Sequence, residues 1–74
     1  MAKNYEIKKR LGTKISYIRK SKNLSQIQLS ELCDLNFNYI GQIERGIANP
    51  TLEKIIKLAE ALDVEVKDLF DFSF

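Results

Sequence analysis

Apolar residues recur every three or four positions along most of this chain, which is the spacing of one buried face of an α-helix. Near the N-terminus, Ile7, Leu11, Ile15 and Ile18 follow this spacing and predict a helix over about residues 5–22. No segment alternates apolar and polar residues for long enough to form a strand. The sequence therefore predicts an all-α fold.

Four further helices are predicted from apolar stripes and from residues that begin or end helices. Ser25, Asn36 and Thr51 carry side-chain oxygens that can cap the second, third and fourth helices. Asp34 tolerates a left-handed turn after the second helix, and Gly46 ends the third. The apolar positions of the four helices are, in chain order, Leu29, Leu32 and Cys33; Ile40 and Ile43; Leu52, Ile55, Ile56, Ala59 and Leu62; and Val66, Leu69 and Phe70.

The chain has 74 residues, which is the size of one small domain. We expect a single compact domain over residues 1–74, with a core at about residues 5–70 and a short aromatic tail at 71–74. One core of this size rarely supplies more than about 3–5 kcal/mol without disulfides, metal or partner subunits. We therefore favour a homodimer.

The residue types argue against most catalytic and metal chemistry. Cys33 is the sole cysteine and the chain has no histidine, so an internal disulfide, a zinc site and an imidazole general base are all excluded. We expect no enzyme activity, no metal and no cofactor, and an inert, buried Cys33. Apolar runs do not exceed two residues, and the basic N-terminal part lacks the apolar stretch of a signal peptide. These features predict no membrane segment and a cytoplasmic location.

Charge is distributed unevenly along the chain. Residues 1–30 hold eight basic side chains and one acidic side chain, a net charge of +7, whereas residues 31–74 carry a net charge of −5. This asymmetry favours a positive face that meets phosphates and an acidic opposite end. The alternative is a lysine-rich helix that is simply solvated.

Three short runs of residues resemble a known family. They are Leu24-Ser25-Gln26 with Leu29-Ser30-Glu31, Tyr39-Ile40-Gly41-Gln42-Ile43-Glu44-Arg45-Gly46, and Asn49-Pro50-Thr51-Leu52. Together they resemble the lambda-repressor-like (XRE or Cro-type) DNA-binding domains, over about residues 11–70. Within that family the size is similar to small phage repressors and to restriction-modification controller proteins. The resemblance implies a compact five-helix domain in which the second and third helices form a helix-turn-helix.

The resemblance also assigns site residues. In such folds the third helix lies in the major groove of DNA. The resemblance implies base contacts from Phe37, Asn38, Tyr39 and Gln42, and phosphate contacts from Gln26 and Arg45; Arg19, Lys20 and Lys22 are phosphate candidates by charge alone.

Each assignment has an alternative. Asn38 and Gln42 are four residues apart on one face and suit adenine, but they also read as ordinary surface amides. Phe37 either contacts a thymine methyl group or packs against the rest of the domain. Arg45 meets phosphate or pairs with Glu44 or another acid. Glycine inside a helix costs about 1 kcal/mol, so Gly41 indicates a close approach of backbone or DNA, or tolerated drift.

The C-terminal residues suggest a dimer interface. An end this short cannot easily bury its apolar side chains alone, namely Leu69, Phe70, Phe72 and Phe74. The competing interpretation packs the tail on the first helix. The sequence thus predicts a dimeric repressor or autoregulatory controller that binds a pseudo-palindromic double-stranded operator. The alternative function is an antitoxin-like or coactivator-like module that acts through protein contacts.

Overall fold

The computed structural model describes residues 6–73, and within that range it contains five helices and no strand. The helices are α1 (Ile7–Ser21), α2 (Gln26–Cys33), α3 (Phe37–Glu44), α4 (Leu52–Leu62) and α5 (Val66–Leu69). This confirms the all-α prediction and the pairing of α2 with α3 as the helix-turn-helix. The predicted start of the first helix at Tyr5 lies outside the described residues.

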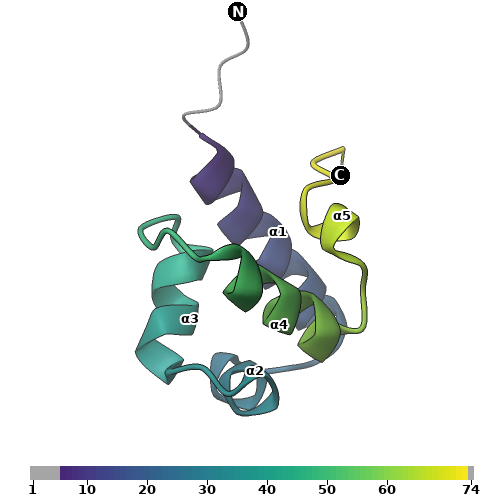
Figure 1. Ribbon diagram of the computed structural model, residues 1–74. Coiled ribbons are helices and arrows are strands. Elements are labelled where there is room, and N and C mark those ends of the chain that lie inside the picture. Colours follow the sequence, from purple (N-terminus) through teal and green to yellow (C-terminus); the bar gives the residue numbers. More distant parts are fainter. Residues whose placement is uncertain (1–5, 74) are drawn as a thin grey trace, which may run out of the picture.

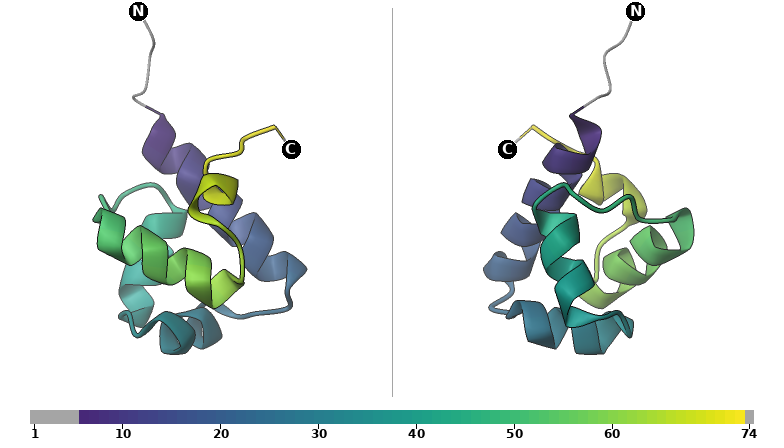
Figure 2. Two further views of the ribbon diagram at one scale, coloured as in Figure 1. Left: turned by 45° about the vertical axis from the view of Figure 1, so that its right-hand side comes forward. Right: turned by 90° about the vertical axis from the view of Figure 1, so that its left-hand side faces the viewer.

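The five helices pack around one core rather than in a simple bundle (Figure 1). α3 packs against both α1 and α2, and α4 packs against α2 and α5. α5 then returns the chain to α1, so that α2 lies at one end of the molecule and α5 lies beside the first turns of α1 (Figure 2). None of these helices is long and apolar enough to cross a membrane.

Side-chain caps fix where the middle helices begin, as the sequence predicts. Ser25 Oγ accepts a hydrogen bond from the Gln28 main-chain N–H at 3.0 Å, and Gln28 Oε1 accepts one from the Ser25 N–H at 2.8 Å. This reciprocal pair is a capping box. Asn36 Oδ1 and Thr51 Oγ1 accept from main-chain N–H groups at the starts of α3 and α4.

Left-handed residues fix where the helices end. Asp34 ends α2 with φ of 55°, and Gly46 follows α3 with φ of 76°. Both positions are foreseen by the sequence, because aspartate and glycine tolerate positive φ. Asn23 and Asp63 also have positive φ, of 59° and 57°; a turn is expected at Asp63, but neither residue was predicted to be left-handed.

The core takes residues from all five helices. Its fully buried large side chains are Ile15, Leu29, Ile40, Ile43, Leu58, Leu62 and Leu69. The predicted stripes were too wide at four places, because Leu32, Leu52, Ile56 and Phe70 are 59%, 67%, 41% and 38% exposed. Leu58 takes a core position in α4 that the prediction left out.

Gly12 sets the distance between α1 and α3. A Cβ built at this position would collide with the main-chain carbonyl oxygen of Ile43 and lie 2.6 Å from that of Glu44. A side chain cannot fit there without moving backbone, because main-chain atoms leave no room to rotate away. The close approach of α1 therefore fixes the position of α3, the helix that carries the predicted base contacts.

Candidate nucleic-acid interface

A groove of about 310 Å³ lies between the start of α2 and the outer face of α3. It is lined by Gln26, Phe37, Asn38, Gly41, Gln42 and Arg45. Five of these six are residues that the sequence assigns to DNA contacts. The fold therefore brings most of the candidate site together from two helices.

The residues along the α3 side of the groove are available for contact. Asn38, Gln42 and Arg45 are exposed, and Phe37 is 46% exposed rather than tucked into the core. Within residues 6–73, the amide side chains of Asn38 and Gln42 make no hydrogen bond. Their donors and acceptors are free to meet base edges in a DNA groove.

A buried carboxylate holds the groove together. Arg19 Nε donates to Glu44 Oε2 at 2.7 Å, and Arg19 Nη2 donates to Glu44 Oε1 at 3.0 Å. Arg19 Nη1 also donates to the Leu24 carbonyl oxygen at 2.7 Å, and Gln26 Nε2 donates to Glu44 Oε1 at 3.0 Å. One network thus joins the end of α1, the following turn, the start of α2 and the end of α3.

This network corrects one assignment. The Arg19 side chain is 9% exposed and forms a two-pronged ion pair with Glu44, so it is a structural residue and not a phosphate contact. The sequence interpretation placed Glu44 in surface electrostatics, but its side chain is only 6% exposed. No local signal could have shown the pair, since its members lie 25 residues apart. Arg45 is not the partner of Glu44 and remains exposed.

Tyr39 lies apart from the other predicted base contacts. It does not line the groove, and it packs partly buried against the core. Its ring lies 4.6 Å from the Lys54 ammonium of α4, which is a cation–π distance. The one-residue offset from Asn38 turns Tyr39 about 100° around the helix, away from the groove face.

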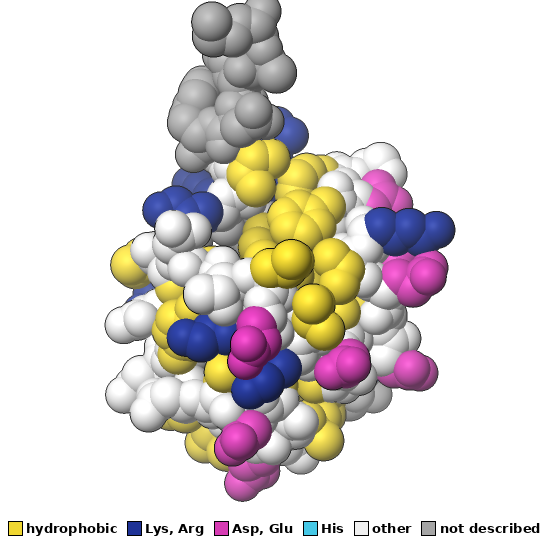
Figure 3. Space-filling view, viewed as in Figure 1, with side chains coloured by type: hydrophobic (Ala, Val, Ile, Leu, Met, Phe, Trp, Pro, Cys, Tyr) yellow, Lys and Arg dark blue, Asp and Glu magenta, His cyan; other side chains and the backbone are white. Residues whose placement is uncertain are grey.

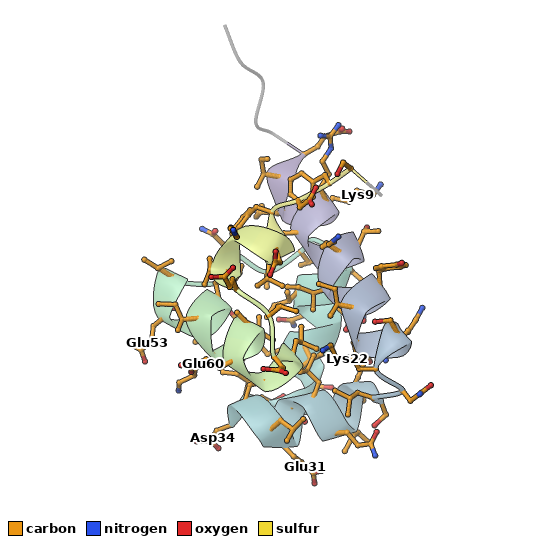
Figure 4. The ribbon with its side chains drawn as sticks, turned by 90° about the vertical axis from the view of Figure 1, so that its right-hand side faces the viewer. Lys9, Lys22, Glu31, Asp34, Glu53 and Glu60 are labelled. Atoms are coloured by element: carbon orange, nitrogen blue, oxygen red, sulfur yellow. The ribbon has the colours of Figure 1, made fainter. Side chains whose placement is uncertain are left out.

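The two remaining phosphate candidates, Lys20 and Lys22, are exposed at the C-terminal end of α1. Figure 4 labels two lysines on and after α1, Lys9 and Lys22, and four carboxylates on or just after α2 and on α4, Glu31, Asp34, Glu53 and Glu60. Lysines also lie on α4, so the two signs of charge are not fully separated on the surface.

Cys33 has no accessible role. The residue is 5% exposed, and its thiol donates to the Leu29 carbonyl oxygen at 3.0 Å. Burial raises the pKa of the Cys33 thiol above its usual value, while main-chain hydrogen bonds act in the opposite direction. A protonated, enclosed thiol is a poor nucleophile, which agrees with the inert cysteine that the sequence predicts.

The C-terminal apolar residues divide between core and surface. Leu69 is fully buried, so the expectation that it offers dimer surface is wrong: α5 turns it inward against α1 and α4. Phe70 is 38% exposed and lies edge-on to Phe72, with ring centroids 6.3 Å apart. Phe72 also contacts α1, with the Arg10 guanidinium 5.9 Å from its ring. Phe74 lies outside the described residues.

A band of hydrophobic side chains nonetheless crosses one face of the molecule. Figure 3 shows this band running over α4, α5 and the first part of α1. The exposed apolar side chains of α4 and of the end of α5 are Leu52, Ile56 and Phe70. The tail therefore packs partly on α1, as one interpretation expected, and still leaves an apolar surface beside it.

Known proteins resemble this chain in sequence and in fold. The helix-turn-helix family HTH_3 matches residues 15–69. Control protein C.BamHI of Bacillus amyloliquefaciens is 49% identical over 63 residues, which cover 84% of this chain and 78% of that protein. The crystal structure of the restriction-modification controller protein C.AhdI from Aeromonas hydrophila has a TM-score of 0.87 and 41% identity, covering 89% of this chain and 100% of that one.

A third relative was solved with its nucleic acid. The structure of SinR, a master regulator for biofilm formation, in complex with DNA has a TM-score of 0.78 and 34% identity. It covers 82% of this chain and 98% of that one, and SinR is a protein of Bacillus subtilis. The family match includes all of α2 and α3 and thus the whole groove between them.

Proposed function

Because the chain belongs to the HTH_3 helix-turn-helix family, we propose that it is a transcriptional regulator that binds a specific double-stranded DNA operator. It acts as a repressor or as an autoregulatory controller, by binding alone and with no catalytic step. A regulator that binds promoters acts in the compartment that holds the DNA, so we place this protein in the cytoplasm. The observation that carries the proposal is the groove beside α3, where uncommitted amide groups face outward in one row.

The face of α3 suits the major groove of B-DNA. That groove is about 12 Å wide and admits one helix. Asn38 and Gln42 lie one helical turn apart on the exposed face, and each amide can form two hydrogen bonds with N6 and N7 of an adenine. Phe37, at the first turn of α3, offers an exposed ring to a thymine methyl group. Half-buried Tyr39 supports α3 from its other side.

Phosphate contacts then position the helix on the duplex. The start of α2 presents main-chain N–H groups and the positive end of an eight-residue helix, which favour a phosphate beside Gln26. Exposed Lys20 and Lys22 add positive charge near the same end of the molecule. Phosphate contacts carry no sequence information. Losing one should weaken binding to every duplex, whereas losing an α3 amide should change which base is preferred.

We also propose that the regulator is a homodimer. Two copies that pair through the exposed apolar side chains of α4 and the end of α5 would hide Leu52, Ile56 and Phe70 from water. A two-fold dimer presents two recognition helices about 34 Å apart, which matches one turn of DNA and a pseudo-palindromic operator. The small size of the single core supports association for the same reason.

Selection from a randomised duplex library at physiological salt tests the function. We expect enrichment of an inverted repeat with half-sites about ten base pairs apart. The variants Asn38→Ala and Lys20→Ala separate the two kinds of contact. Loss of the Asn38 amide should relax base preference at one position, whereas loss of the Lys20 charge should weaken all duplexes alike and reduce the salt dependence. A library from which no motif emerges would refute sequence-specific binding.

Sedimentation velocity tests the dimer. Phe70→Lys should shift the chain toward monomer, because it places a charge in the proposed apolar contact. Ile27→Lys is the matched control, since Ile27 is 53% exposed on α2 and does not line the hollow where α2 meets α4. If both variants remain dimeric, the proposed surface is wrong.

A further inference from the structure

Gly41 leaves an empty position in the middle of the α3 face that lines the groove. A Cβ at this position would lie 3.2 Å from Nη1 of Arg45 and 3.8 Å from Oε1 of Gln26. The nearest atoms are thus the ends of side chains, in contrast to Gly12, which meets main-chain atoms. Gly41 has an ordinary helical φ, so the backbone does not require glycine. What the missing side chain provides is space for the guanidinium of Arg45.

The Arg45 side chain lies back along α3 toward the N-terminus of the helix. Helical side chains lean in that direction, so a residue covers the turn that precedes it. Arg45 follows Gly41 by one turn, and its Nη1 lies beside the Gly41 backbone, which is buried although it is on the groove side. The guanidinium is therefore placed near the middle of the recognition face, with Gln26 and Gln42 also lining the groove.

This guanidinium is also uncommitted. Glu44 is the acidic neighbour in sequence, but its carboxylate already accepts hydrogen bonds from Arg19 and Gln26. Arg45 forms no ion pair with any residue between 6 and 73. An unpaired cation in the centre of a polar groove is available to a ligand.

We propose that Arg45 reads a guanine of the operator, and that Gly41 is the specificity-determining position that makes room for it. The inference rests on the proposed function and refines it, because Arg45 was first assigned to phosphate. A guanidinium donates two parallel hydrogen bonds to O6 and N7 of guanine, the commonest specific contact in the major groove. The Arg45 guanidinium lies beside Gly41, near the middle of α3, and lines the same protein groove as Asn38 and Gln42. This position directs its donors toward base edges.

Base selection with three variants tests this. The wild-type chain should prefer guanine at one position of each half-site, and Arg45→Ala should lose about 5- to 150-fold of discrimination at that position alone. Arg45→Lys should not restore it, since an ammonium lacks the paired donors. Gly41→Ala should weaken the preference at the same position, because its methyl group occupies the space beside Nη1. Alanine favours helix more than glycine does, so this variant keeps α3 folded.

The salt dependence of binding identifies the competing role. Lys20→Ala, the matched control for a phosphate contact, should lower the slope of log affinity against log salt by about one, while Arg45→Ala should leave it nearly unchanged. If Arg45→Ala weakens all duplexes equally and lowers the slope, Arg45 holds phosphate and the inference is overturned. If Gly41→Ala keeps the full guanine preference, the role of Gly41 is overturned. If the wild-type chain selects no sequence, the proposed function itself fails.

Discussion

Replacing Glu44 by glutamine tests whether the buried carboxylate organises the domain. Glu44 and Arg19 are 6% and 9% exposed, and the carboxylate accepts three hydrogen bonds, two from Arg19 and one from Gln26. Removing one member of a buried pair costs about 3–5 kcal/mol, because the other charge stays buried and uncompensated. A single core of this size supplies about the same amount, so Glu44→Ala should be largely unfolded.

Glu44→Gln gives a measurable loss instead. The amide also leaves the Arg19 charge without a counter-charge and removes one acceptor for Arg19, but it keeps the shape of the side chain and one acceptor oxygen, which offsets part of that cost. Hydrogen bonds to charged groups contribute about 1.5–3 kcal/mol each, so we expect the free energy of unfolding to fall by about that amount. Urea unfolding followed by circular dichroism measures it, with the slope m unchanged if the folded and unfolded states keep their exposed areas.

Salt and a control variant separate this buried pair from a surface pair. Raising NaCl from 0.05 to 1 M should leave the loss in Glu44→Gln nearly unchanged, since salt screens buried charges poorly. Lys67→Gln breaks the exposed Lys67–Glu65 pair, whose side chains are 79% and 76% exposed, and should have little effect on stability. A loss below about 0.5 kcal/mol for Glu44→Gln, or one that vanishes in 1 M salt, would refute the reasoning.

Four further substitutions test two glycines, a helix cap and the buried thiol. Gly12→Ala should lower the free energy of unfolding by about 1–3 kcal/mol, because its methyl group collides with main-chain oxygens of α3. Gly41→Ala should raise the free energy of unfolding by up to about 1 kcal/mol. Urea titrations in which both variants change in the same direction would contradict this. Ser25→Ala should cost about 1 kcal/mol by removing the cap of α2, and an unchanged urea midpoint would count against that cap. Burial raises the pKa of the Cys33 thiol, so the folded chain holds this proton more tightly than the unfolded chain. The resulting stability is fully present below the unfolded pKa, near 8.5, and is lost as pH rises through the folded pKa. Wild type should therefore lose more stability than Cys33→Ala above about pH 8.5, and identical pH profiles would exclude the effect.

The parts of the fold that depend on neighbouring residues were predictable. The caps at Ser25, Asn36 and Thr51 each involve main-chain N–H groups two or three residues away, so the sequence alone specifies them. The left-handed ends at Asp34 and Gly46 depend on one residue each. The groove face of α3 was also predictable, because a four-residue spacing places Asn38 and Gln42 together on any helix.

The parts that depend on packing between helices were not. An apolar stripe gives the direction of a buried face but not its width, which is why Leu32, Leu52 and Ile56 were placed in the core and lie exposed. Gly12 gave no signal, since the need for a missing side chain arises only where α3 crosses α1. Leu69 was assigned to the surface because the sequence does not show that α5 folds back onto α1.

The partner that the Glu44 carboxylate binds decides which arginine side chain remains available to DNA. From charge alone, Arg19 and Arg45 are equivalent candidates, and adjacency in sequence favours Arg45 as the partner of Glu44. The fold reverses this pairing: Arg19 neutralises Glu44 from 25 positions away, and Arg45 is left unpaired beside Gly41 in the groove. The buried pair therefore does two things at once, since it ties α1 to α3 and frees the arginine that the recognition face presents. Glu44→Gln, which leaves the domain folded, should consequently also disturb operator selection, because it weakens the tie between α1 and the helix that presents Arg45.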